Sequence, residues 1–530
     1  VVNPNQQERE QPYIERNVNA TREALNLTDV DVRSVAFGSL TATDVEDDIA
    51  PLENVRLLNP VQMESRFLVD RGEVAGLTID DLDVDRYVLE DSRDGDPEEV
   101  LVAARELDLA GVTNKSWQGL HLINTRGCGL VVAPAGRVLE SQRPDYRTVE
   151  LERPELYFSE ILTGYAIANT SSTERECSEP HQYEGTLGVE MSSFTRRAAF
   201  ALAFLDYNVL GFGGIDDDSQ MLWVRGVNDR LEKLAPFLSY DADPYPVAVD
   251  GRVVWVTDAY TTSSRYPYGQ RIGDVQRSPQ SGLDDNDNYV RNSVKAVVDA
   301  YTGDVKFYVV DEQDPILRAW RGAFPDLFTP FSEMPEELVD NLRYPEDLFK
   351  VQRTILARYH VEDPASFYNG QDFWTIPNDP TNRAVNALQP PYYLTLRMPG
   401  TAAPKFSLTT TFAPQKRQTL AAFMAVDSVP GPTYGTIRVL QLPRNTTVPG
   451  PTQVQNNFES EPAIAEQLTL LRRGGADVEF GNLLSLPVSG GVLYVEPVYV
   501  RAAQGQCFPL LRMVLVSYGD SMVVGVFLEG

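Results

Sequence analysis

Residues 454–500 read VQNNFESEPAIAEQLTLLRRGGADVEFGNLLSLPVSGGVLYVEPVYV, and along this stretch helical periodicity gives way to the pattern of strands. Ile464, Leu468 and Leu471 recur at the spacing of one helix face, which predicts a helix that begins near Pro462. Apolar residues at this spacing mostly report burial. The stretch is therefore predicted to be part of a core rather than a functional site.

The ends of this helix are also marked in the sequence. Ser460 precedes it as the expected cap, and Gly474-Gly475 is expected to end it. Two apolar runs follow at 483–488 and 492–500, joined by the Ser-Gly-Gly turn at 489–491. They predict a β-hairpin directly after the helix.

The middle of the chain repeats this mixture of hairpins and helices. Asp250-Gly251 and the turn at 301–304 each separate two strand-like runs, which predicts two further hairpins. Residues 312–375 change to helical spacing. The predicted fold class is α+β, with antiparallel sheets and flanking helices in a large protein of several subdomains. The predicted division is an N-terminal helical segment 1–68, a β-rich subdomain 69–190, a mixed central subdomain 191–390 and a β-rich subdomain 391–530 with one helix.

The charge balance narrows the classes of partner. The chain of 530 residues has 46 basic and 76 acidic side chains, and its formal net charge is −30. Nucleic acid is excluded as the main partner, since binding phosphates requires clustered Lys and Arg. Tight docking on anionic lipid is also disfavoured. Such a surface favours solubility and the binding of cations.

The cysteines leave two interpretations open. Cys128 and Cys177 are about fifty residues apart, and a disulfide between them is feasible in an oxidising compartment. The alternative is that these two and Cys507 are buried thiols. The sequence contains no CxxC and only three scattered histidines, which disfavours a Cys/His zinc site.

One acidic run resembles part of a calcium loop. Asp284, Asn286 and Asn288 place oxygen ligands at alternate positions, as calcium loops do. The run lacks the glycine and the distal glutamate that complete such loops, so a solvated acidic loop is the alternative. Calcium is the one cofactor that the sequence suggests. Common hydrolase, phosphate-loop and metalloprotease motifs are absent from the sequence.

A tyrosine-rich segment offers a second candidate site. Tyr260, Tyr266 and Tyr268, together with Arg265, can stack on a sugar or a peptide. Tyrosines in such segments are equally common as packing residues. Nearby carboxylates can hydrolyse a glycoside when they lie about 5–10 Å apart, which a sequence alone does not show.

Six blocks of the chain, spread over almost its whole length, resemble one known family, the uncharacterised protein family 0182 of bacterial multi-pass membrane proteins. Two of the blocks are DPYPVAVDGRVVWVTDAYTTSSRYPYGQR and LRYPEDLFKVQRTILARYHVEDPASFYNGQDFWTIPNDP. The blocks lie, in this order, at residues 3–27, 243–271, 288–320, 342–380, 397–414 and 448–500.

The resemblance implies a location rather than a reaction. Family members carry several transmembrane helices ahead of a large domain outside the cytoplasm, and this chain resembles that domain. No run in the chain approaches the ~20 apolar residues of a membrane helix. The chain departs from the family in the region 125–190, so a disulfide there is expected to be particular to this protein or its near relatives.

Two functions follow as hypotheses. The first is a binding or scaffold role in the cell envelope, in which the domain contacts envelope polymer or partner proteins and is anchored by transmembrane helices outside this chain. The second is an extracytoplasmic hydrolase that acts on envelope glycans or lipids through paired carboxylates. The family has no established activity, so the resemblance assigns no catalytic residue.

Overall fold

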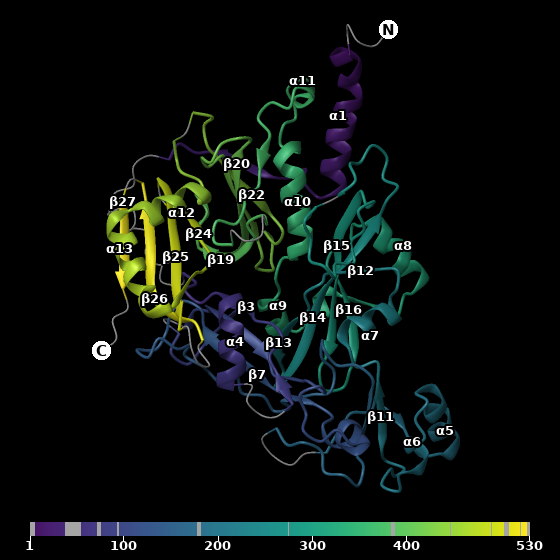
Figure 1. Ribbon diagram of the computed structural model, residues 1–530. Helices are drawn as coiled ribbons and strands as arrows, with labels where there is room; N and C mark the ends of the chain where they lie inside the picture. Colours follow the sequence, from purple (N-terminus) through teal and green to yellow (C-terminus); the bar gives the residue numbers. More distant parts are fainter. Residues whose placement is uncertain are drawn as a thin grey trace.

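The fold combines antiparallel sheets with helices that pack between and outside them, which confirms the predicted α+β class (Figure 1). No closed barrel is present among the described strands. The computed structural model describes residues 6–37, 55–71, 76–92, 95–177, 182–273, 275–382, 387–445, 447–488, 490–502, 508–519 and 521–526.

A six-stranded sheet forms the centre of the molecule. Its two longest strands are β14 (Arg252–Ser263) and β15 (Tyr289–Asp299), which pair antiparallel along almost their whole length. The predicted turn at Asp250-Gly251 is confirmed, and both residues have the positive φ that a tight hairpin needs. The other strands are β12 (Ser239–Tyr240), β13 (Tyr245–Val249), β16 (Val305–Val309) and β17 (Phe328–Pro330).

The helix α10 (Glu346–Tyr359) stands between the central sheet and a second sheet (Figure 1). Its Leu348, Val351 and Ile355 are buried in a core shared with α1 (Gln6–Ala24) and with both sheets. The second sheet contains β1 (Asp31–Ser34), β18 (Trp374–Thr375), β19 (Tyr392–Leu396), β20 (Lys405–Pro414), β21 (Ala422–Asp427) and β22 (Ile437–Gln441).

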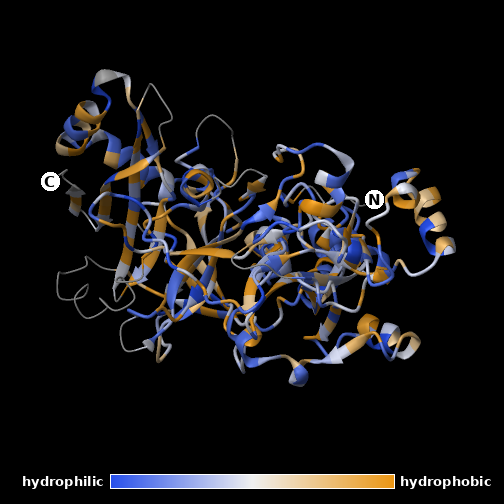
Figure 2. Cartoon of the chain, turned by 90° about the horizontal axis from the view of Figure 1, so that it is seen from below, coloured by the Kyte–Doolittle hydropathy of each residue, from blue (hydrophilic) through white to orange (hydrophobic). Residues whose placement is uncertain are grey.

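The C-terminal stretch forms a third sheet with two helices on its outer side (Figure 1). The predicted helix begins at Pro462, and the predicted hairpin forms, although Ser489 of its turn lies outside the described residues. Figure 2 shows hydrophobic residues along the strands nearest the C-terminus. The elements are α12 (Pro451–Ser460), α13 (Pro462–Leu471), β23 (Asp477–Phe480), β24 (Leu484–Val488), β25 (Gly491–Arg501), β26 (Leu510–Tyr518) and β27 (Ser521–Val526).

The predicted cap of this helix is wrong. Ser460 is the last residue of α12, and its hydroxyl donates to the carbonyl oxygens of Asn456 and Asn457 within that helix. The residue that precedes α13 is Glu461, whose side chain makes no capping hydrogen bond.

Smaller sheets complete the lower part of the molecule as drawn in Figure 1. The hydrophobic cores join residues from distant parts of the sequence, since Phe67, Leu101 and Phe406 lie in one cluster. The division into four subdomains stays a prediction. Among the described residues, the helices lack the combination of length and apolar composition that crossing a bilayer requires. The strands of these smaller sheets are β2 (Leu77–Thr78), β3 (Asp83–Tyr87), β4 (Glu98–Ala104), β5 (Glu106–Leu107), β6 (Gly127–Cys128), β7 (Leu130–Pro134), β8 (Glu155–Leu156), β9 (Tyr165–Ala168), β10 (Val189–Glu190) and β11 (Gln220–Trp223).

The remaining helices are short. Several of them cover the central sheet, and α5 and α6 project from the lower right of Figure 1 beside β11. Their bounds are α4 (Pro60–Arg71), α5 (Phe194–Ala203), α6 (Asn208–Gly211), α7 (Val227–Leu234), α8 (Pro315–Ala323), α9 (Glu336–Asp340) and α11 (Pro364–Tyr368).

Candidate cation-binding site

Three carboxylates from two distant segments converge beside the central sheet. Asp83 is the first residue of β3, Asp81 precedes it by two residues, and Asp243 lies in the link between β12 and β13. One carboxylate oxygen from each residue lies within 4.8 Å of the other two. We call these three residues and the pocket beside them the acidic pocket.

Arg343 holds the inner side of this group in place. Its Nη2 donates to Oδ1 of Asp83 at 2.6 Å, and its Nη1 donates to the carbonyl oxygen of Val84 at 3.2 Å. The guanidinium also lies over the ring of Tyr245, 3.7 Å from its centroid. Buried pairs of this kind fix geometry because separating them leaves an uncompensated charge. Asp83 is therefore held at one position beneath the pocket.

The outer side of the group opens into a pocket of about 340 Å³. Asp81, Asp243 and Glu346 bring carboxylates to its wall, and Ser278 brings a hydroxyl. Glu346 is in the first turn of α10, and the ammonium of Lys350 lies 2.7 Å from it. The pocket thus joins the end of α10 to the edge of the central sheet.

Burial and crowding shift the acidity of this group. Burial raises the pKa of Asp83 to about 7, although Arg343 acts in the opposite direction. Burial, and after it the charges of Asp83 and Asp81, raise the pKa of Asp243 well above its ordinary value. Burial and Glu106 do the same to the pKa of Glu160, whose other interacting charges include Asp243. Ionised together, these carboxylates repel one another, so the site favours protons or a metal cation.

The geometry suits a divalent cation that prefers oxygen ligands. Calcium binds oxygens at 2.3–2.6 Å, so two ligands of one ion lie no more than about 5 Å apart. The three carboxylates of the acidic pocket meet that limit. Asp81, Asp83 and Asp243 would hold the ion, and Glu346 and Ser278 line the space in which further ligands would lie.

The predicted calcium residues Asp284, Asn286 and Asn288 are engaged within their own loop. Oδ1 of Asp284 accepts from the backbone N–H of Asn286 at 2.8 Å and from its Nδ2 at 2.9 Å. Oδ1 of Asn286 accepts from Arg271 at 3.0 Å, and Oδ1 of Asn288 accepts from the backbone N–H of Tyr266 at 2.9 Å. These contacts fasten the loop, and calcium binding by it stays a prediction.

The four predicted ligand-binding residues do not form one group. Tyr260 lies on β14, is 0% exposed, and donates its hydroxyl hydrogen to Asp241. Tyr266 stacks on Tyr289 with ring centroids 5.6 Å apart, whereas Tyr268 is 52% exposed beside α1. Arg265 is exposed on the same loop. A binding role for the loop residues stays a prediction.

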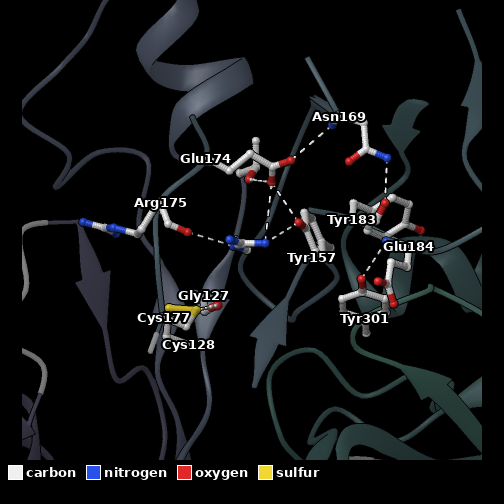
Figure 3. Close-up of polar contacts among 12 residues, drawn as sticks. Gly127, Cys128, Tyr157, Asn169, Glu174, Arg175, Cys177, Tyr183, Glu184 and Tyr301 are labelled. Carbon is white, nitrogen blue, oxygen red and sulfur yellow. Dashed lines mark hydrogen bonds and ion pairs between the residues drawn. A yellow bond between two sulfur atoms is a disulfide. The ribbon is translucent and has the colours of Figure 1, made fainter. Parts of the chain in front are cut away.

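A disulfide joins Cys128 and Cys177, whose Cα atoms lie 5.3 Å apart (Figure 3). Of the two interpretations that the sequence left open, the structure contains the disulfide. Cys128 is buried on β6, and Cys177 ends a segment that begins after β9. Cys507 lies outside the described residues.

A buried ionic network lies beside this disulfide (Figure 3). Oε2 of Glu174 accepts from the hydroxyls of Thr125 at 2.7 Å and Tyr157 at 2.8 Å. Arg126, which is 0% exposed, lies 3.8 Å from the same carboxylate and donates to Tyr157. The disulfide and this network together hold the segment 169–177 against β6, so their role is structural.

Sequence analysis did not assign the acidic pocket. The alternation of Asp81, Asp83 and Asp85 was a usable signal, because residues two apart on a strand share a face. Asp241 and Asp243 show the same spacing, but no sequence signal pairs them with Asp81 and Asp83, since only the fold brings Asp243 to β3.

The fold and the site define an α+β protein with a pocket of converging carboxylates, and comparison with known proteins shows its family. Residues 1–471 match the family described as "Uncharacterised protein family (UPF0182)". The chain belongs to this family, which confirms the resemblance found in the sequence. The family's description assigns it no function.

Bacterial relatives align with nearly all of the chain. The UPF0182 protein of Kineococcus radiotolerans is 42% identical over 576 residues, which cover 100% of this chain and 56% of the relative. The UPF0182 protein of Streptomyces coelicolor is 43% identical over 550 residues, which cover 98% of this chain and 54% of the relative. The chain thus spans little more than half the length of these curated relatives. No solved structure matches it.

Proposed function

We propose that this chain is the extracytoplasmic domain of a multi-pass bacterial membrane protein. The disulfide between Cys128 and Cys177 supports this location, because structural disulfides persist mainly in oxidising compartments. The relatives extend well beyond the aligned region, and we assign transmembrane helices to that further length.

Labelling in intact cells tests the location. Tyr207 is 80% exposed, so Tyr207→Cys in the full-length protein presents a thiol at the surface. We expect a membrane-impermeant maleimide to label this variant in whole spheroplasts. The matched control is a cysteine in a cytosolic protein of the same cells, which reacts only after lysis. Labelling of Tyr207→Cys only after lysis would contradict the proposed location.

We further infer that the domain has a binding role in the cell envelope and that a divalent cation in the acidic pocket takes part in it. The observation that carries this inference is the approach of three carboxylate oxygens to within 4.8 Å of one another, beside a pocket that two of the three residues, Asp81 and Asp243, line. A calcium ion held there would keep open coordination positions toward the pocket. An anionic envelope polymer or an acidic segment of a partner protein is the class of ligand that such an ion can hold.

Calorimetry and a retention assay test the binding role. Titrating calcium chloride into the chelator-treated domain is expected to show one saturable site, with weaker binding of magnesium. The domain is then expected to be retained by purified anionic cell-wall polymer in calcium and released by chelator. The absence of saturable calcium binding would exclude the cation site, whereas retention that ignores chelator would exclude only the role of the cation.

A hydrolase of envelope glycans or lipids is the second candidate function. One observation favours it: burial raises the pKa of Asp83 to about 7, and the carboxyl of Asp243 lies beside it. A carboxyl with a pKa near neutrality can act as a general acid. Chelator-resistant release of sugars or fatty acids that Asp243→Asn abolishes would favour this function over binding.

A further inference from the structure

Three ionisable side chains form a buried row across the central sheet. Asp258 on β14 is the direct cross-strand partner of Lys295 on β15. On the other side of β14, the backbone N–H of Asp241 donates to the carbonyl oxygen of Asp258 at 2.8 Å. The exposed fractions are 4% for each aspartate and 0% for the lysine. Cross-strand partners share one face of a sheet, so these groups lie side by side in the interior.

Lys295 and Asp258 are in direct contact, with Nζ of the lysine against Oδ1 of the aspartate. Nζ also donates to the carbonyl oxygen of Arg343 at 2.6 Å, and it lies 5.7 Å from the centre of the Tyr434 ring. Backbone and aromatic groups therefore enclose the amine beside the carboxyl. A pair held at this range can react as an intramolecular pair, with the entropy of encounter already lost in folding.

The surroundings favour the uncharged form of the Asp258 carboxyl. Burial raises the pKa of Asp258, although the charge of Lys295 opposes that shift. A buried ammonium–carboxylate pair is costly to desolvate, and transfer of one proton within the pair yields a neutral amine and a neutral carboxylic acid.

We propose that Lys295 and Asp258 join in an intramolecular isopeptide bond that links β14 to β15. The amine Nζ of Lys295 attacks Cγ of Asp258, a bond forms between these atoms, and one Cγ–O bond breaks. The oxygen leaves as water with one proton from the carboxylic acid and one from the amine. The step is a condensation, so it needs no oxidant, reductant or added cofactor.

Another lysine–aspartate contact shows why this pair is the candidate. Lys405 lies 3.0 Å from Asp427, but its side chain is 30% exposed, and Arg438 binds the same carboxylate. Two cations therefore share this carboxylate, and water reaches the lysine. The pair lacks the enclosure that holds Lys295 against Asp258, so we expect no bond there.

The bond would stabilise the part of the molecule on which the acidic pocket depends. β12 ends beside Asp241, and the link that follows it carries Asp243 to the pocket. A covalent tie between β14 and β15 replaces a buried ion pair with a neutral amide and cannot open by strand separation. Such a tie suits a domain exposed to proteases and mechanical load.

Mass spectrometry of the purified chain tests the proposal. After reduction and denaturation, we expect an intact mass lower than that of the sequence by one water molecule. Tryptic digestion is expected to yield a branched peptide that contains both Asp258 and Lys295, with no cleavage after Lys295. The full sequence mass for the folded wild-type chain would overturn the proposal whether or not any variant folds.

Two matched variants locate the bond. Lys295→Arg keeps a cation but lacks the primary amine, so we expect it to show the full mass of its sequence. Lys405→Arg changes the half-exposed pair in the same way, and we expect it to retain the loss of one water. A loss of water that persists in Lys295→Arg would place the reaction elsewhere and overturn the assignment.

Discussion

The acidic pocket and the acidic loop at 284–288 contain similar oxygen ligands in opposite arrangements. In the loop, Asp284 accepts hydrogen bonds from Asn286, and Asn286 accepts one from Arg271, so their oxygens already have nearby donors. In the pocket, Asp83 accepts from Arg343 on one side and meets two further carboxylates on the other. The oxygens of the loop therefore have hydrogen-bond donors of their own, whereas the carboxylates of the pocket are crowded together with an excess of negative charge.

Distance along the chain explains this difference. Short polar side chains close together in sequence can turn back to their own backbone N–H groups, as Asp284 does with Asn286. In the pocket, Asp81 makes one such local bond, with the backbone N–H of Leu82 at 2.7 Å, whereas Asp83 is bound by Arg343, which is distant in the sequence. The fold brings these carboxylates close together. Their negative charges must then be neutralised by protons, by Arg343 or by a bound cation.

The largest expected effect is the loss of the calcium response in the pocket. For wild type, calcium at a hundredfold excess over its dissociation constant is expected to raise the free energy of unfolding by about 2.7 kcal/mol. Asp243→Asn removes one of the three converging carboxylates and is expected to abolish most of that increase. Thermal unfolding with and without calcium measures it.

Asp284→Asn is the matched control for this prediction, because it removes one charge from the loop and leaves the pocket intact. It is expected to keep the full calcium response. If Asp284→Asn loses the response and Asp243→Asn keeps it, calcium binds at the loop, and the comparison of the two regions is reversed.

The elements that the sequence predicted are those that local signals define. The Asp250-Gly251 hairpin, the apolar face of α10 and the hairpin of β24 and β25 are confirmed because turn residues and periodicity act within a few positions. Ser460 was misassigned because a serine hydroxyl can also bond back to the carbonyls of a preceding helix.

The candidate site was harder to predict, because sequence signals act within a few positions and the site is formed by residues distant in the sequence. Tyr260 was grouped with Tyr266 and Tyr268, but β14 continues to Ser263 and carries Tyr260 into the core. The pocket depends on the approach of β3 to the link after β12, which is a tertiary contact. The spacing of Asp81 and Asp83 was visible in the sequence, but their partner Asp243 was not.

Without divalent cations, the pocket and the loop are expected to change the free energy of unfolding in opposite directions as pH rises. The pKa of Asp83 rises from an ordinary value near 4 to about 7 on folding, so the folded state binds more protons in that interval. This term stabilises the fold at acidic pH and is lost as pH rises toward 7. Hydrogen bonds from Asn286 lower the pKa of Asp284, whose stabilising term is therefore lost as pH falls.

The measurement is the free energy of unfolding in urea, with and without calcium. The interval from pH 3 to pH 5 reports on the loop, and the interval from pH 5 to pH 8 reports on the pocket. We expect the wild-type value to fall between pH 5 and pH 8 without calcium, and calcium to offset that fall. Asp243→Asn is expected to flatten the pH dependence, since it relieves the crowding of carboxylates in the pocket. A wild-type stability that rises across this range would contradict the assignment of the raised pKa values.

The smallest expected effect is a loss of stability without loss of the calcium response, in Asn288→Ala. The side chain of Asn288 accepts from the backbone N–H of Tyr266 and donates to the carbonyl oxygens of Tyr266 and Gly269 at 2.8 and 3.1 Å. Asn288 is only 6% exposed, so its loss leaves backbone groups without partners, and we expect a cost of roughly 1–2 kcal/mol in the free energy of unfolding. Because the loop is fastened independently of the pocket, added calcium should stabilise Asn288→Ala as much as wild type. A variant that unfolds at the same urea concentration in calcium and in chelator would instead show that the loop and the pocket act as one cation-dependent unit.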